Sequence, residues 1–192
     1  MRTLIILISL FLFTTGNAQK KNITVDKVQA KEAFELLNDI RMNPKKYAKA
    51  LGISNISKIT GTKLIWNDTL AKVAELRAYD MANHNYFDHV SPKGLGPNYY
   101  ISKGGYPLNS DWLKKSAANN FESIAANHPT ASDGIKAFVI GKNSPGFMHR
   151  KHVLGMDEWN GSLVDIGIGF VRVPSGAQYT TYLCVLIAKH DW

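Results

Sequence analysis

LVDIGIGFVRV (Leu163–Val173) and YTTYLCVLIA (Tyr179–Ala188) stand near the end of the chain on either side of the short segment PSGAQ. In the first run, apolar residues alternate with Asp165, Gly167 and Gly169, which is the two-residue period of a β-strand with one face in the core. The second run is almost continuously apolar, which is typical of a central strand. Two such runs across a proline- and glycine-containing turn predict an antiparallel hairpin.

Amphipathic helices are predicted ahead of this hairpin. Asp26 and Gln29 resemble a capping box, and the helix that follows should place Val28, Ala30, Phe34, Leu37 and Ile40 in the core. Asn43-Pro44 should end that helix and begin another over 44–51, capped by Asn43 and closed by Gly52. Further helices are predicted after Asn67 or Asp68 and over 130–141, with a short strand over 119–127. The segment 87–110 is interpreted as a long functional loop. Helices followed by strands predict an α+β domain with helices packed on an antiparallel sheet.

The N-terminus has the pattern of a secretory signal peptide over residues 1–18. Arg2 precedes a short apolar run, Leu4–Phe13, and small residues lead to Ala18. A bilayer-spanning helix needs about 20 residues, so this run is too short for a stable span, although an uncleaved anchor remains the alternative. We therefore expect a secreted, extracellular or periplasmic protein with no transmembrane segment after cleavage. Residues 19–29 form a lead-in and helix start, and 30–192 form one domain.

The net charge and the cysteine content limit which partners and which internal disulfides are expected. The formal net charge is +8, but the basic residues come as scattered pairs without a nucleic-acid motif, so nucleic acid is not an expected partner. The single cysteine, Cys184, allows no internal disulfide and is interpreted as a small buried hydrophobe. We expect a monomer.

Four residues are candidates for a functional site: His89, Glu122, His149 and His152. His149 and His152 are three residues apart, so a helix would place them on one face, where they are either metal ligands or an ordinary polar helix start. Glu122 lies between apolar neighbours, and it must either be paired in a cleft or face solvent on an edge strand. The sequence contains no HExxH zinc motif and no GxSxG nucleophile motif.

The order of the segments resembles the CAP superfamily, the SCP-like extracellular proteins that include cysteine-rich secretory, antigen-5 and pathogenesis-related proteins. LNDIRMNPKKYA is followed by LIWNDTLAKVAELRAYDMANHNYFDHVSPKG, then NFESIA, SPGFMHRKHVL and DIGIGF. The resemblance implies a three-layer α-β-α sandwich with a mostly antiparallel central sheet. It also implies a cleft lined by His89, Glu122 and His149, and these three residues are the metal ligands it suggests, with Zn²⁺ or another divalent metal as cofactor.

Two departures from the family pattern bear on this cleft. Phe147-Met148 separates SPG from HR, where many bacterial relatives have SPGHR, so His152 is an alternative to His149 as the second cleft histidine. The helix segment GIKAFVIGKN lacks the second glutamate of many animal members, and Phe138 stands where tryptophan is usual.

Three functions remain open from the sequence. The first is a secreted, non-enzymatic module that binds a divalent metal or a small, lipidic or envelope ligand. The second is a metal-dependent hydrolase acting on envelope or extracellular polymers, with a metal-bound water as nucleophile. The third is an extracellular interaction domain whose cleft histidines are structural. Family membership does not choose among them.

Overall fold

The sheet is built on the predicted hairpin. The computed structural model describes residues 22–142 and 144–191, so the predicted signal peptide over 1–18 lies outside the described residues. Strands β4 (Asp165–Arg172) and β5 (Thr181–Ala188) pair antiparallel, with Gly169 opposite Cys184. Strand β3 (Glu122–Ala126) pairs antiparallel with the other edge of β5, which confirms β5 as a central strand.

Two short strands complete the sheet on the free edge of β4. Strand β1 (Thr24–Val25) is antiparallel to the end of β4, and β2 (Ile65–Trp66) is parallel to its start. The sheet therefore has the order β1-β4-β5-β3, with β2 also on β4, and is mostly antiparallel.

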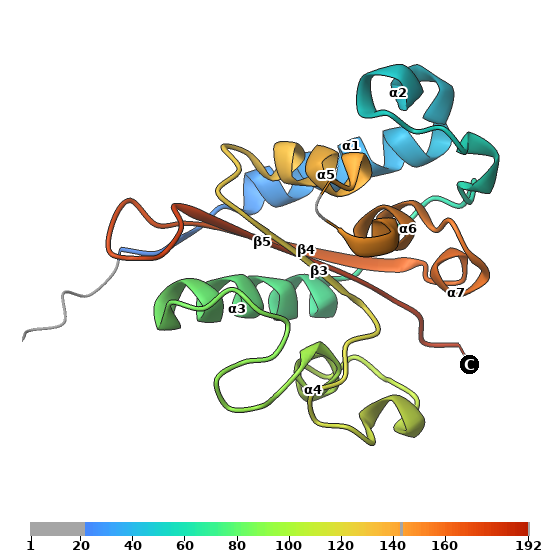
Figure 1. Cartoon of the computed structure of the whole chain (residues 1–192). Helices are drawn as coiled ribbons and strands as arrows, with labels where there is room; N and C mark the ends of the chain where they lie inside the picture. The colour runs from blue at the N-terminus through green and yellow to red at the C-terminus, as the bar shows by residue number, and fades with distance from the viewer. Residues whose placement is uncertain (1–21, 143, 192) are drawn as a thin grey trace, which may run out of the picture.

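Helices cover both faces of this sheet (Figure 1). One face carries α1 (Lys27–Met42), α2 (Pro44–Leu51), α5 (Ala131–Ile140) and α6 (Met148–Leu154), after which comes α7 (Glu158–Gly161). The opposite face carries α3 (Asp68–His84) and α4 (Pro97–Lys103). Short 3₁₀ turns occur at Ile56–Lys58, Ser110–Leu113 and Pro145–Phe147. The three-layer α-β-α sandwich expected from the sequence is confirmed.

The helix ends follow the predicted capping chemistry with one exception. The side chains of Asp26, Asn67 and Thr130 accept hydrogen bonds from the backbone amides of the first turns of α1, α3 and α5. Gly52 ends α2 in the left-handed conformation at φ 61°. The side chain of Asn43 does not cap α2. It turns toward α1, where its Nδ2 donates to Asp39 Oδ1 at 2.7 Å.

Two other sequence predictions need correction. Helical periodicity predicts that Val28 lies in the core, but it is 68% exposed because the buried stripe of α1 follows Ala30, Ala33, Leu37 and Ile40. The segment 87–110 is not one loop, because Pro97, at the first helical position, begins α4. No helix among residues 22–142 and 144–191 has both the length and the apolarity to cross a membrane.

Two glycines of β4 allow α3 to lie directly on the sheet. A Cβ atom at Gly167 would lie 2.1 Å from the carbonyl carbon of Leu70, and one at Gly169 would lie 2.3 Å from that of Ala74. These distances are far inside van der Waals contact, and the neighbours are backbone atoms that cannot rotate away. Glycine at both positions therefore fixes how closely α3 approaches β4.

We predict that Gly169→Ala destabilises the fold by about 1–3 kcal/mol or more, because the added methyl group forces α3 away from β4. Urea denaturation followed by circular dichroism measures the change in the free energy of unfolding. The matched control is Gly61→Ala, whose new Cβ would meet no atom within 4 Å. That control should leave stability unchanged or raise it by up to about 1 kcal/mol. Equal stability of the two variants would contradict the packing argument.

Candidate functional site

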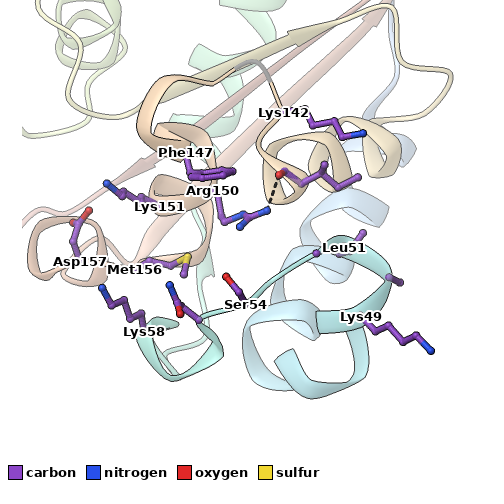
Figure 2. A pocket seen from close by; sticks show the side chains of 14 residues that line it. Lys49, Leu51, Ser54, Lys58, Lys142, Phe147, Arg150, Lys151, Met156 and Asp157 are labelled. Carbon is purple, nitrogen blue, oxygen red and sulfur yellow. Dashed lines mark hydrogen bonds between the residues drawn. The ribbon is translucent and has the colours of Figure 1, made fainter.

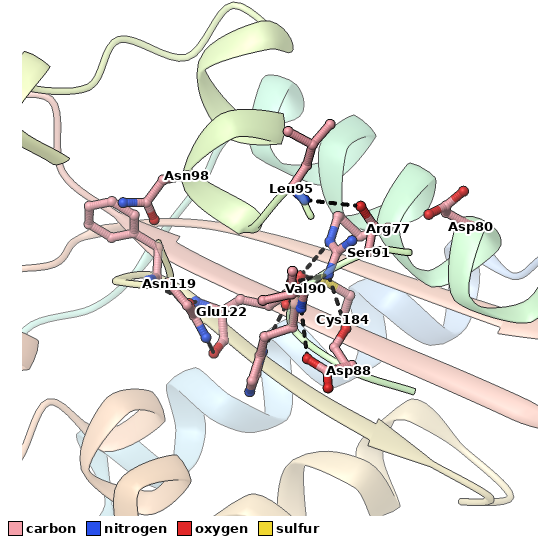
Figure 3. A network of polar contacts seen from close by, with 12 residues as sticks. Arg77, Asp80, Asp88, Val90, Ser91, Leu95, Asn98, Asn119, Glu122 and Cys184 are labelled. Atoms are coloured by element: carbon pink, nitrogen blue, oxygen red, sulfur yellow. Dashed lines mark hydrogen bonds and ion pairs between the residues drawn. The ribbon is translucent and has the colours of Figure 1, made fainter. Parts of the chain in front are cut away.

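A buried ion pair joins α3 to β3. Arg77 Nε lies 2.9 Å from Glu122 Oε2, and Arg77 Nη2 lies 3.2 Å from Glu122 Oε1, so the pairing is bidentate. The side chains are 1% and 0% exposed. Figure 3 shows both residues converging with Cys184, whose Sγ lies 3.3 Å from Glu122 Oε2. Glu122 is thus paired within the structure, as the first of the two sequence alternatives required.

The Arg77 guanidinium also holds the segment that follows α3. Arg77 Nη1 donates to the Tyr86 hydroxyl at 3.0 Å, and Nη2 donates to the backbone carbonyls of Asp88 and His89 at 3.3 and 2.9 Å. Asn119 Oδ1 accepts from the Glu122 backbone amide at 3.0 Å, which fixes the start of β3. The position of His89 therefore depends on Arg77.

The ion pair keeps both groups charged. Burial alone would raise the pKa of Glu122, but hydrogen bonds from His89 and Arg77 and the charge of Arg77 outweigh it and hold that pKa below its ordinary value. Burial alone would lower the pKa of Arg77, but its hydrogen bond to Glu122 and the charge of that carboxylate raise it. Glu122 is therefore an ionised carboxylate at neutral pH, with its oxygens already accepting hydrogen bonds.

The same carboxylate orients His89. His89 Nδ1 lies 2.9 Å from Glu122 Oε1, and since an ionised carboxylate only accepts, the proton of the imidazole lies on Nδ1. This leaves Nε2 as the free nitrogen of the ring. The His89 side chain is 35% exposed.

Helix α6 supplies the other two histidines in different environments. His149 is half-buried and packs on Phe138, with ring centroids 4.9 Å apart. Burial, with the nearby charge of His89, lowers the pKa of His149. His152 is 7% exposed, and its Nδ1 lies 2.7 Å from the Ser123 hydroxyl of β3. His152 Nε2 is buried and has no hydrogen-bond partner among the described residues.

The four predicted residues line a single cavity of about 310 Å³, here called the histidine cleft. His89 lies in the segment that follows α3, and Glu122 lies in β3. His149 and His152 both lie in α6. The other lining residues are Asn119, Asn120, Phe121, Ser123, Met148, Trp159 and Asn160.

Sequence reasoning missed Arg77 as a member of this site. It occupies the buried stripe of α3 between Ala74 and Ala78, where periodicity calls for an apolar side chain. A cation in such a position needs a buried anion, so Arg77 itself was the indication that Glu122 would be paired.

The proposed three-ligand metal set meets a physical obstacle at Glu122. Both carboxylate oxygens accept hydrogen bonds from Arg77, and Oε1 also faces His89. Within the described ranges, no group of three or more His, Cys, Asp or Glu side chains is arranged to hold a metal ion. The protein donors that fit a metal here are imidazole nitrogens, and Glu122 would act behind His89, fixing its tautomer and orientation.

We predict that Glu122→Gln destabilises the protein by about 3–5 kcal/mol, because it leaves the Arg77 charge buried without an anionic partner. Chemical denaturation at pH 7 measures this loss. The matched control is Asp111→Asn, which removes an exposed carboxylate paired with Lys114 at 2.8 Å. The control should change stability by less than about 1 kcal/mol. A similarly small effect of Glu122→Gln would contradict the assigned role of the pair.

Protonation of His152 is expected to destabilise the fold in mild acid. Burial lowers its pKa from 6.5 to about 4, with the charges of His149, His89 and Arg41 acting in the same direction. A group whose folded pKa is depressed contributes stability above its unfolded pKa and loses it as the pH falls toward the folded value. We predict that the stability difference between the wild type and His152→Asn shrinks as the pH falls from 6.5 toward 4 in urea denaturation. Parallel pH curves for the two proteins would contradict this.

The chain is similar to proteins of one family. The model of the cysteine-rich secretory protein (CAP) family matches residues 34–186. The uncharacterized protein YkwD of Bacillus subtilis (strain 168) is 33% identical over 114 residues, which are 59% of this chain and 36% of YkwD. An extracellular protein containing an SCP domain from Bacillus anthracis aligns over 85% of this chain and 41% of its own, at 23% identity and a TM-score of 0.54.

These relatives extend beyond the matched domain, since this chain spans well under half of the length of either Bacillus protein. The structural match confirms the sandwich fold, and the family model covers most of the described residues. The chain belongs to the cysteine-rich secretory protein (CAP) family.

Proposed function

We propose that this chain is an extracellular CAP domain that acts by binding rather than by catalysis, and that the histidine cleft is its ligand site. The observation that carries this proposal is the orientation of His89, whose Nδ1 is fixed by Glu122 and whose partly exposed ring lines the cavity. His149 supports it, because a lowered pKa keeps its imidazole neutral at pH 7. Two imidazoles on one cavity provide hydrogen-bonding or metal-ligating groups to a small ligand.

The state of Glu122 argues against a hydrolase. A general base works best with a pKa near the operating pH, and Glu122 is held below its ordinary pKa by Arg77 and His89. Its oxygens are engaged, so it has no free lone pair directed at a water in the cleft. A second carboxylate does not line the cavity in the part of the chain that the structure describes.

A divalent metal fits the cleft only through its imidazoles. Zn²⁺ accepts neutral imidazole nitrogen, and a carboxylate behind the histidine is its usual supporting partner. His89 and His149 would hold the ion, and water or a bound ligand would fill its other positions. Two protein donors are fewer than the three of an ordinary catalytic zinc site, so we expect modest affinity.

Export and a monomeric state are part of the same proposal. The signal-peptide pattern over 1–18 and the extracellular SCP-domain protein of Bacillus anthracis both support a secreted chain. The ligand is then a small molecule, lipid or envelope component outside the cytoplasm.

We predict that Zn²⁺ shifts the imidazole NMR signals of His89 and His149. Because each histidine is one of two donors, His89→Ala and His149→Ala should each weaken Zn²⁺ binding at least about tenfold at pH 7.5. Binding should weaken as the pH falls, because protonated imidazole cannot ligate a metal. The matched control is His128→Ala, which lies outside the cleft. Zn²⁺ binding that survives both cleft substitutions would contradict the metal assignment, and Glu122-dependent turnover of an envelope polymer would contradict the binding function.

A further inference from the structure

A second, larger cavity lies on the α1 side of the sheet and is strongly basic. It has a volume of about 780 Å³ and opens between α2, the Ile56–Lys58 turn, α5 and α6; it is called the basic cavity below. Among its lining residues are five cations: Lys49, Lys58, Lys142, Arg150 and Lys151. One acidic residue, Asp157, lines it as well.

The charge of this cavity is not neutralised by the protein. Within the described residues, none of the five cations takes part in an ion pair, although lysines and arginines elsewhere in the chain do. Both oxygens of Asp157 accept hydrogen bonds from Asn160 at the start of α7, at 2.8–2.9 Å. The single carboxylate is therefore engaged as a helix cap, and the cavity keeps a net positive potential.

Arg150 lines the basic cavity, and its guanidinium is held in place by neighbouring groups. It is 8% exposed, its Nε donates to the Val139 carbonyl, and its Nη2 donates to the Ile140 carbonyl at 2.6 Å. The Phe147 ring covers one face of the guanidinium, 4.5 Å from Cζ to the ring centroid. Nη1 makes no hydrogen bond to any described residue. Figure 2 shows the Ser54 hydroxyl on the opposite wall, pointing toward Arg150.

A buried cation, Arg41, lies beside Gly155, the residue that precedes Met156 of the cavity wall. Arg41 is 1% exposed, and all three of its guanidinium nitrogens lack a hydrogen-bond partner among the described residues. A Cβ at Gly155 would lie 3.2 Å from Arg41 Nη2, and Gly155 adjoins Met156 of the cavity wall. Burial lowers the pKa of Arg41 to about 10, so it is still charged at pH 7. A buried unpaired charge is unfavourable, and an anion nearby would offset it.

We propose that the basic cavity binds the phosphate group of a phosphate-bearing ligand. A pinned guanidinium with a free edge matches the oxygens of a phosphate, and flexible lysines around the rim add point charges that can fold over it. The apolar side chains Leu51, Ile140, Phe147 and Met156 line the same cavity and would contact the part of the ligand next to the phosphate. The phosphate belongs either to a small soluble ligand or to a lipid headgroup. This site is separate from the histidine cleft and does not depend on it.

Titration of the ¹⁵N-labelled protein with inorganic phosphate at constant ionic strength tests the site. The amides of Ser54, Asn55 and Arg150 should shift in a saturable manner, and Ser54→Asp, which places a carboxylate opposite Arg150, should weaken binding at least tenfold. Lys58→Glu/Lys151→Glu should have the same effect. Its control, Lys63→Glu/Lys72→Glu, changes the net charge equally at exposed positions outside the cavity, and should retain wild-type affinity within twofold.

Vesicles distinguish the two sources of phosphate. A lipid headgroup is supported as the ligand if the protein sediments with phosphatidylglycerol vesicles but not with phosphatidylcholine vesicles. Lys58→Glu/Lys151→Glu should then abolish this sedimentation, and the control Lys63→Glu/Lys72→Glu should not. Inorganic phosphate binding without sedimentation would support the site with a soluble ligand. The proposal is overturned if neither inorganic phosphate nor the vesicles bind, or if Lys58→Glu/Lys151→Glu and Lys63→Glu/Lys72→Glu lose binding equally. It is also overturned if phosphate shifts the amide signals of the histidine cleft instead of those of the basic cavity.

Discussion

The buried Arg77–Glu122 ion pair is the interaction on which the histidine cleft depends. It joins a helix on one face of the sheet to an edge strand, and the same guanidinium holds the backbone carbonyl of His89 at 2.9 Å. Two desolvated charges are tolerated because their pairing is bidentate and because neighbouring polar groups satisfy the remaining donors. The carboxylate that is needed to balance Arg77 is the one that orients His89, so the stability of the fold and the geometry of the cleft are set by one pair.

Helix α3, which carries Arg77, lies directly on β4. Gly167 and Gly169 leave no side chain between the strand and the backbone of Leu70–Glu75, and the rest of α3 continues from there to Arg77. The two glycines, which in the sequence only marked a strand face, therefore also set how closely the helix that carries Arg77 packs on the sheet. The face opposite to α3 is filled by α1 and α5, so the histidines of α6 reach the cleft from the other helical layer (Figure 1).

Periodicity and capping residues were sufficient to predict the hairpin, the central position of β5, and the helices around Leu37, Val73 and Phe138. The three-layer sandwich was implied by the family resemblance. Periodicity and capping failed at Val28 and over 97–103, where a local pattern was outweighed by tertiary packing or by a proline that begins a helix. The segment resemblance selected four residues that line one cavity, but it did not reveal that Glu122 is already paired. The two partners are 45 residues apart in sequence, so a local pattern could show that Arg77 needs an anion but not which carboxylate supplies it.

Phe147 and Met148, the two residues that separate SPG from HR in this chain, lie between the two cavities. Phe147 has φ 56°, a left-handed conformation that is strained for a side chain of this size, and its ring covers Arg150 in the basic cavity. Met148 lines the histidine cleft. A Cβ at Gly141 would lie 2.7 Å from the Phe147 ring, so the glycine that ends α5 also provides the space for this turn. The inserted residues are thus placed to form a wall of each cavity, and the strained turn at the start of α6 sets the positions of both Arg150 and His149.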